Sequence, residues 1–117
     1  MDEYPIEDLE ITPRMADLLR VFLEDPGVPH YGFDLMRRTR QPSGTLYPLL
    51  AKMQAARWLT VGTEDIDPSK AGRPARRFYR ITGAAVLAAR AQLTALSQRY
   101  APPAPVLPRL EPNGGTL

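Results

Sequence analysis

Three short apolar stripes of helical period, separated by proline-containing turns, constrain the first half of the chain more than any other feature. Their spacing predicts three helices, over residues 13–25, 30–38 and 43–57. Thr12-Pro13 predicts the first start, because threonine caps a helix and proline tolerates the first helical position. The breaker Pro26–Pro29 and the tight turn Arg40–Pro42 separate the helices. The first half is therefore two short helices and a third that follows a tight turn.

The third helix contains a proline that constrains where it begins. An interior proline removes one hydrogen bond and clashes with the preceding turn, so we expect Pro48 in the first turn. This favours Thr45 over Ser43 as the cap. Opposite the buried stripe lie small residues and a single cation, Lys52. Such a face lets the helix lie close against a partner surface.

The second half combines a hairpin with one more helix. Residues 58–61 and 76–81 have the aromatic and β-branched character of strands, and the turn formers at 65–74 make the connection a long loop, or wing. Thr82 caps a last helix, whose apolar residues follow a 3-4 spacing over about two heptads. These residues face either a dimer partner or the domain's own core: Val86, Ala89, Leu93, Leu96 and Tyr100.

This order of elements is that of a winged helix-turn-helix, a mainly α fold with a small β-hairpin. A length of 117 residues suits one domain. We divide it into an acidic N-terminal arm, the winged helix-turn-helix, a C-terminal dimerisation helix and a proline-rich tail predicted to be disordered, at residues 1–11, 12–81, 82–100 and 101–117. In this fold the helix after the turn enters the major groove of DNA.

The net charge of +2 hides a strong division along the chain. Residues 1–36 carry two basic and nine acidic side chains (net −7), whereas residues 37–80 carry ten basic and three acidic ones (net +7). Residues 81–117 add three basic and one acidic side chain (net +2). A basic middle segment is typical of a surface that binds a polyanion such as DNA, since each phosphate contact releases counterions. The alternative is an ordinary solvated face.

The composition argues against other classes of protein. With no cysteine and one histidine, His30, the chain lacks the usual zinc ligands and a thiol nucleophile. We therefore predict no enzymatic activity, metal or cofactor, and a packed or surface role for His30. No apolar run approaches the roughly 20 residues of a membrane span, and the acidic start is unlike a signal peptide. We expect a cytoplasmic protein without a membrane partner.

Three sequence blocks stand out in the winged region: Tyr31–Leu35, Gly44–Leu50 and Gly72–Thr82. In this order they resemble the signature blocks of the PadR-like transcriptional regulators, and the likeness runs through about residues 12–100. The single helix after the wing resembles the family's shorter subclass. The resemblance implies a homodimer, joined through the C-terminal helix, that binds an inverted-repeat operator and usually represses transcription. The sequence assigns no small-molecule effector, and Trp58 either packs in the core or lines a pocket for one.

The resemblance and the charge pattern together assign residues to DNA contact. On the third helix and in the wing, the resemblance implies contacts by Thr45, Tyr47, Pro48, Lys52 and Arg73. Charge and position add Arg37, Arg38, Lys70, Arg76 and Arg77. Alternatively, Tyr47 packs within the fold and the wing arginines are only solvated. Arg37 and Arg38 would then only stabilise the dipole at the end of the second helix. Because Gly72-Arg73-Pro74 fixes an arginine at a stiff turn, Arg73 is the strongest single prediction.

The preferred interpretation is a dimeric repressor on double-stranded DNA. The third helix of each protomer enters a major groove, and the two grooves are successive and roughly 34–36 Å apart. The operator is therefore expected to be quasi-palindromic. The alternative is a winged-helix module that docks an acidic protein partner through the same basic surface. Salt-dependent binding to a specific duplex separates the two interpretations.

Overall fold

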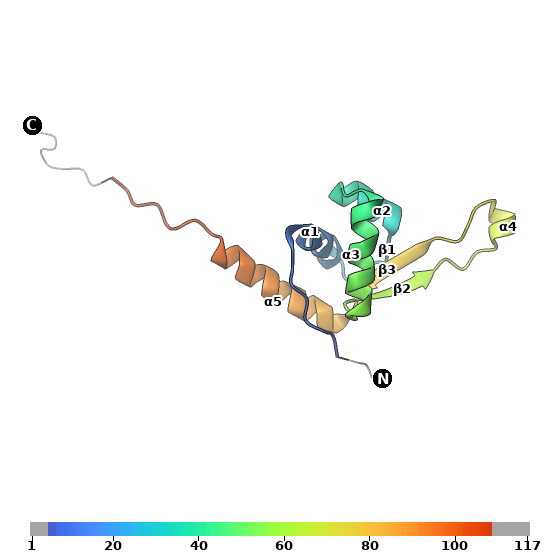
Figure 1. Cartoon of the computed structure of the whole chain (residues 1–117), viewed down its shortest axis with the longest axis horizontal. Helices are drawn as coiled ribbons and strands as arrows, with labels where there is room; N and C mark the ends of the chain where they lie inside the picture. Colours follow the sequence, from blue (N-terminus) through green and yellow to red (C-terminus); the bar gives the residue numbers. More distant parts are fainter. Residues whose placement is uncertain (1–4, 109–117) are drawn as a thin grey trace, which may run out of the picture.

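Five helices and three strands follow one another through residues 5–108, the part of the chain that this computed structural model describes (Figure 1). In chain order they are α1 (Pro13–Glu24), β1 (His30–Tyr31), α2 (Gly32–Thr39), α3 (Ser43–Ala55), β2 (Leu59–Thr63), α4 (Pro68–Ala71), β3 (Arg77–Ile81) and α5 (Gly83–Arg99). The predicted mainly α fold with a small β-hairpin is confirmed. The predicted arm and tail extend into residues 1–4 and 109–117, which lie outside the described residues. Residues 101–108 of the tail are exposed and form no helix or strand.

Helix α1 begins where the sequence predicts. Thr12 Oγ1 accepts a hydrogen bond from the Met15 N–H at 3.3 Å, and Pro13 takes the first helical position. The helix ends at Glu24, before the breaker. Its apolar stripe is completely buried at Met15, Leu18, Leu19 and Phe22. Because this burial removes apolar surface from water, the stripe anchors α1 in the core.

Residues 30 and 31 form a strand, so the prediction of a helix from His30 to Arg38 is wrong at its start. They make up β1, which pairs antiparallel with β3 and sets His30 opposite Tyr79. Helix α2 begins at Gly32 instead. The partner strand lies far along the chain, and a spacing pattern within one segment cannot reveal it.

Helix α3 begins at Ser43, so the predicted shift of its start to Thr45 is wrong. Pro48 lies inside the helix and has no N–H to give to the Gly44 carbonyl, one turn before it. Gly44 is exposed and has no side chain, and nothing lies within 4 Å of the place where a Cβ would stand. Water can therefore satisfy that carbonyl, and the helix accommodates its proline.

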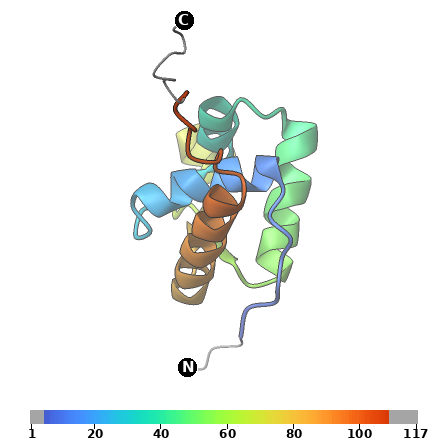
Figure 2. The ribbon, with the colours of Figure 1, turned by 90° about the vertical axis from the view of Figure 1, so that its left-hand side faces the viewer.

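The end of α3 is joined to the N-terminal segment. The helix ends at Ala55, before the predicted residue 57, because Arg57 has a left-handed backbone conformation with φ 66°. Trp58 is completely buried, and its Nε1–H donates to the Glu7 carbonyl oxygen at 2.7 Å. The Glu7 N–H in turn donates to the Ala56 carbonyl oxygen at 2.9 Å. Trp58 is thus a core residue, and the segment that it holds runs beside α3 (Figure 2).

Strands β2 and β3 form the predicted hairpin, and β1 adds a third strand on the other side of β3. At the outer end of the hairpin, Thr63 pairs with Arg77. The loop beyond holds α4, a short helix that the sequence analysis did not predict. Asp67 caps α4 and Pro68 takes its first position, the same signal that marks the start of α1. The wing, residues 59–81, projects from the body of the molecule (Figure 1).

Helix α5 packs against α1. Thr82 caps it as predicted, and the Thr82 Oγ1 accepts a hydrogen bond from the Ala85 N–H at 3.3 Å. Ala85 and Ala89 are completely buried, and their small side chains allow the two helices to lie close together. On the outer side of α5, Leu87 is 73% exposed. The outer side of α5 thus exposes a large apolar side chain beside Arg90 and Thr94.

Candidate nucleic-acid interface

The outer face of α3 is nearly uncharged. Lys52 is the one charged side chain in this helix. It is exposed together with Pro48, Ala51 and Ala55, whereas Thr45 is half-buried. The small side chains leave the helix narrow on this side, which suits a groove that admits one helix.

Tyr47 has both a packing contact and an open face. Its side chain is 42% exposed, yet its ring lies against Gly32 at the start of α2. A Cβ at Gly32 would come within 2.9 Å of the Tyr47 Cε1, closer than real Cβ atoms approach other atoms. The absence of a side chain at Gly32 therefore sets the position of the ring. DNA contact by Tyr47 stays a prediction beside this structural role.

A hollow of about 660 Å³ lies between α2, α3 and the start of β3. Three residues that the sequence predicted to contact DNA border it: Tyr47, Arg76 and Arg77. Their elements are far apart in the sequence, so the fold is what brings the residues together. The rest of the lining is three aromatic residues, a glycine and one acid: Tyr31, Phe33, Tyr79, Gly32 and Asp34.

The cations that end α2 are engaged by acids of the same chain. The Arg37 Nη2 lies 2.9 Å from Asp34 Oδ1, and the Arg38 Nη2 lies 2.7 and 2.8 Å from the two carboxylate oxygens of Glu24 on α1. The hydrogen bond from Arg38 holds the pKa of Glu24 below its usual value. Exposed pairs of this kind contribute little to stability. Phosphate contact by Arg37 and Arg38 stays a prediction.

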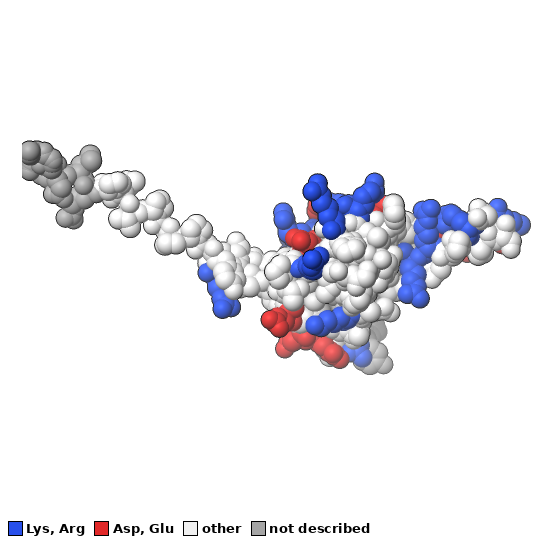
Figure 3. Space-filling model, turned by 45° about the horizontal axis from the view of Figure 1, so that its top comes forward, with Lys and Arg blue, Asp and Glu red and all other residues white. Residues whose placement is uncertain are grey.

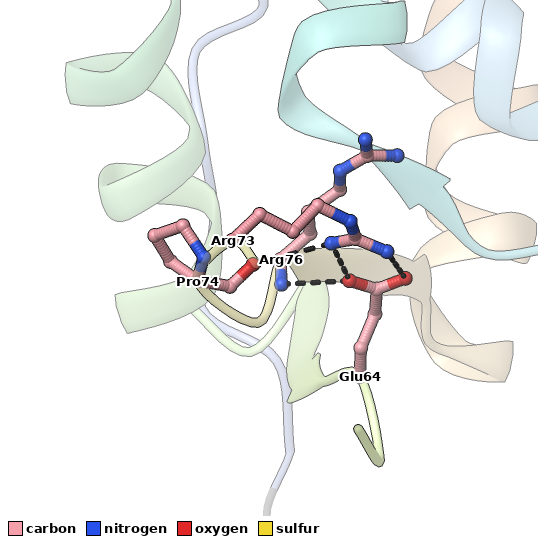
Figure 4. Close-up of polar contacts among 4 residues, drawn as sticks. All are labelled: Glu64, Arg73, Pro74 and Arg76. Atoms are coloured by element: carbon pink, nitrogen blue, oxygen red, sulfur yellow. Dashed lines mark hydrogen bonds and ion pairs between the residues drawn. The ribbon is translucent and has the colours of Figure 1, made fainter. Parts of the chain in front are cut away.

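Arg73, the strongest prediction from the sequence, is held by a carboxylate within the wing (Figure 4). Its Nη1 and Nη2 lie 2.7 and 3.3 Å from the Oε1 and Oε2 of Glu64, and its Nη1 also donates to the Pro74 carbonyl oxygen at 3.2 Å. Hydrogen bonds from the Arg73 side chain and the Arg76 backbone lower the pKa of Glu64 to about 2. Sequence reasoning missed Glu64, because no local pattern joins it to a partner across the loop.

Other cations of the region carry no such partner. Within residues 5–108, no acidic side chain lies within ion-pair distance of Lys52, Lys70, Arg76 or Arg77. All four side chains are exposed. In Figure 3, Lys and Arg gather over the wing and along the upper edge of the body, while Asp and Glu gather below. Unpaired positive charge therefore lies on the wing and on the open face of α3.

The one histidine is packed. The His30 ring meets the Phe22 ring edge to face, with centroids 5.2 Å apart, and burial lowers the pKa of His30. No group of three or more His, Cys, Asp or Glu in the described part of the chain is placed to hold a metal ion. Among residues 5–108, no helix has the length and apolar character needed to cross a membrane.

Solved structures share this arrangement. A Streptococcus mutans protein, smu.1704, matches with a TM-score of 0.58 and 19% identity over 82% of this chain and 84% of that one. A PadR-like transcription factor from Bacteroides fragilis matches with a TM-score of 0.54 and 20% sequence identity, over 73% of this chain and 84% of that one. The chain has the fold of a PadR-like transcription factor. A Streptococcus transcriptional regulator matches with a TM-score of 0.52 and 23% sequence identity, over 72% of this chain and 84% of that one. No protein-family model and no curated protein matches the sequence.

In this PadR-like fold the residues predicted for the dimer follow one side of α5 but differ in exposure along it. Ala89 is completely buried within the chain, and Val86 and Leu93 pack against the core, so the expectation is corrected for Ala89, which has no surface to offer a partner. Leu96 is half-buried and Tyr100 is 71% exposed. The exposed Leu87 was missed, because the helical spacing followed the apolar stripe that faces the core.

Proposed function

We propose that the chain is a PadR-like transcriptional regulator that binds double-stranded DNA. One observation carries the proposal: Tyr47 of α3 and the unpaired Arg76 and Arg77 of the wing border the same hollow. A helix with an open face therefore stands beside cations on a projecting hairpin, and two proteins of this fold are named as a transcription factor and a transcriptional regulator. With α3 in the major groove, the wing arginines lie against the adjacent phosphates.

In this proposal the open face of α3 determines how the base sequence of the DNA is recognised. With Lys52 as its one cation, this helix supplies little of the electrostatic attraction to phosphate. Small and aromatic side chains such as Ala51 and Tyr47 suit contacts with thymine methyl groups and with groove shape. The uncapped first turn of α3 leaves backbone amides toward which a phosphate is attracted. Affinity then comes mainly from the wing, and base selectivity from α3.

The protein acts as a homodimer in this proposal, through α5. One side of α5 already faces the core, and an apolar residue on the outer side gains stability when a partner covers it. The outer side presents Leu87, and the end of the helix presents Tyr100. A groove of about 690 Å³ runs between this end and the N-terminal segment, where Ile11 and Leu96 line it. A second copy would cover these surfaces and place two α3 helices on a quasi-palindromic operator.

Salt-dependent binding tests the DNA-binding proposal. A labelled duplex from the region upstream of the gene is titrated with protein at several salt concentrations, beside a scrambled duplex of the same length. We expect preference for the first duplex and an affinity that falls steeply with salt. Arg77→Gln should reduce the slope of log K against log salt by about 1.8, the effect of one phosphate for each protomer of the dimer. The matched variant Arg20→Gln, on α1 and outside the proposed interface, should leave the slope unchanged.

The opposite outcome points to another class of protein. Equal binding to both duplexes, with a slope that Arg77→Gln does not change, overturns the proposal in favour of a module that docks an acidic protein. Repression in the cytoplasm is tested separately with a reporter gene behind the bound region. Reporter output should fall when the protein is supplied and recover with Arg77→Gln.

A further inference from the structure

One carboxylate closes the wing loop. Glu64 follows the end of β2, and its side chain is 14% exposed, whereas that of its partner Arg73 is 37% exposed. Both Nη atoms of Arg73 face both carboxylate oxygens, at 2.7 and 3.3 Å. Two-pronged pairs of this kind are among the stronger ionic contacts in proteins. The carboxylate is therefore shielded from water and neutralised by Arg73.

The same carboxylate joins the two strands of the hairpin. The Glu64 N–H donates to the Arg76 carbonyl oxygen at 2.9 Å, which extends the ladder beyond the Thr63–Arg77 pair. In the reverse direction, the Arg76 N–H donates to Glu64 Oε1 at 2.9 Å. The backbone at Arg76 is thus fixed by both the main chain and the side chain of Glu64 (Figure 4).

The rest of the loop presents Arg73 to this carboxylate. Gly72 ends α4 with φ 71°, a left-handed conformation that glycine adopts without strain. The Gly72 and Arg73 N–H groups both donate to the Pro68 carbonyl oxygen, at 2.9 and 3.3 Å. Pro74 restricts the backbone on the other side of Arg73. The stiff turn recognised in the sequence therefore points its arginine inward, at Glu64.

From this geometry we propose that Glu64 and Arg73 are positioning residues of the wing, and that Arg76 and Arg77 contact the phosphates. The inference rests on the proposed DNA-binding function. To reach a phosphate, Arg73 would give up its two-pronged ion pair with Glu64, which is unfavourable. Arg76 and Arg77 have no ion pair to break within the described residues. The Glu64–Arg73 pair instead holds the strand from which these two side chains project.

The salt dependence of binding distinguishes a positioning residue from a phosphate contact. Arg77→Gln should lower the slope of log K against log salt by about 1.8, because each protomer of the dimer loses one phosphate contact. Arg73→Gln should weaken binding about tenfold without changing that slope, and Glu64→Gln should do the same. The double variant of Glu64 and Arg73 should bind no more weakly than either single variant, because the pair acts as a unit.

The contrary result is just as distinct. If Arg73→Gln lowers the slope by about 1.8 and Glu64→Gln tightens binding, then Arg73 is itself a phosphate contact that Glu64 restrains. The proposal is then overturned.

Amide hydrogen exchange tests the positioning role without DNA. Glu64→Ala removes the side-chain acceptor of the Arg76 N–H, so exchange of that amide should rise roughly tenfold. Asp65→Ala, at an exposed neighbouring acid, should leave it unchanged. Unchanged protection in Glu64→Ala overturns the positioning role whatever the DNA result. If exchange responds as expected while the native protein binds no duplex, the proposed function fails and the role of Glu64 in the wing stands.

Discussion

Replacing Gly32 with alanine tests the packing that places Tyr47 over the open face of α3. Gly32 is buried at the first position of α2, and an added Cβ would lie 2.9 Å from both Cε1 and Cζ of the Tyr47 ring. The ring has to move to accept it. In an open helical site the same substitution stabilises a protein by roughly 0.5–1 kcal/mol, because alanine loses less backbone entropy on folding than glycine.

Two opposing effects set the magnitude. Overpacking of a close contact costs about 1–3 kcal/mol, and the entropy gain offsets part of it. We therefore expect Gly32→Ala to lower the free energy of unfolding by about 1 kcal/mol, since the half-exposed ring of Tyr47 can turn away from the new Cβ. Gly83→Ala is the matched control, since Gly83 is the first residue of α5 and nothing lies within 4 Å of its Cβ position. That variant should raise the free energy of unfolding by roughly 0.5 kcal/mol.

Urea denaturation of Gly32→Ala in the native protein and in the Tyr47→Ala protein isolates the contact between the new Cβ and the ring. Tyr47→Ala removes the ring atoms that the new Cβ would meet, so Gly32→Ala should become neutral or stabilising in that background. Circular dichroism in the far ultraviolet gives the unfolding curves. If Gly32→Ala destabilises the native and Tyr47→Ala proteins equally, the proposed contact does not position the tyrosine and the reasoning is refuted.

Three further predictions concern α5, the histidine and the wing. Leu87→Glu should give a monomer by light scattering with unchanged helix content, while Leu107→Glu in the exposed tail should stay dimeric; a dimeric Leu87→Glu protein contradicts the role of α5. Burial lowers the pKa of His30, so the unfolded chain binds its proton more readily than the folded one and stability should fall as pH drops through 6.5. Urea unfolding at about pH 7.5 and pH 5.5 should show this loss, and His30→Phe should reduce it. Because the pKa of Glu64 falls from 4.5 to about 2 on folding, its stabilisation is complete above pH 4.5 and is lost toward pH 2. Acid unfolding of Glu64→Gln should therefore be less steep, and an unchanged acid transition would contradict the ion pair.

The sequence could predict those elements whose cause is local. Thr12 and Thr82 mark helix starts because each cap accepts a hydrogen bond from an amide within the next turn, and both bonds are present. Strand β1 was mistaken for helix because its partner strand is distant in the sequence. The start of α3 was misplaced because an exposed Gly44 accommodates Pro48, a compensation between two residues that a rule about one residue omits.

In the candidate site, residue types could be predicted but their pairings could not. The stiff turn at Arg73 is present, yet the availability of its charge depends on Glu64 across the loop. Likewise, helical spacing finds the apolar residues of α5 without separating those that face the core from those that face outward. Ala89 belongs to the first group and Leu87 to the second.

The acids of the N-terminal segment lie apart from the cations of the wing, so the molecule has a separation of charge. Glu7, Asp8 and Glu10 are exposed, and the bonds from Glu7 to Ala56 and Trp58 fix their segment at the end of α3. The wing carries the unpaired cations Lys70, Arg76 and Arg77 instead. Such a charge separation experiences a torque in the field of a polyanion, so under the proposed function the wing would turn toward DNA before the two molecules touch. The benefit lies in the association rate, and it fades as salt shortens the screening length to about 10 Å at 0.1 M.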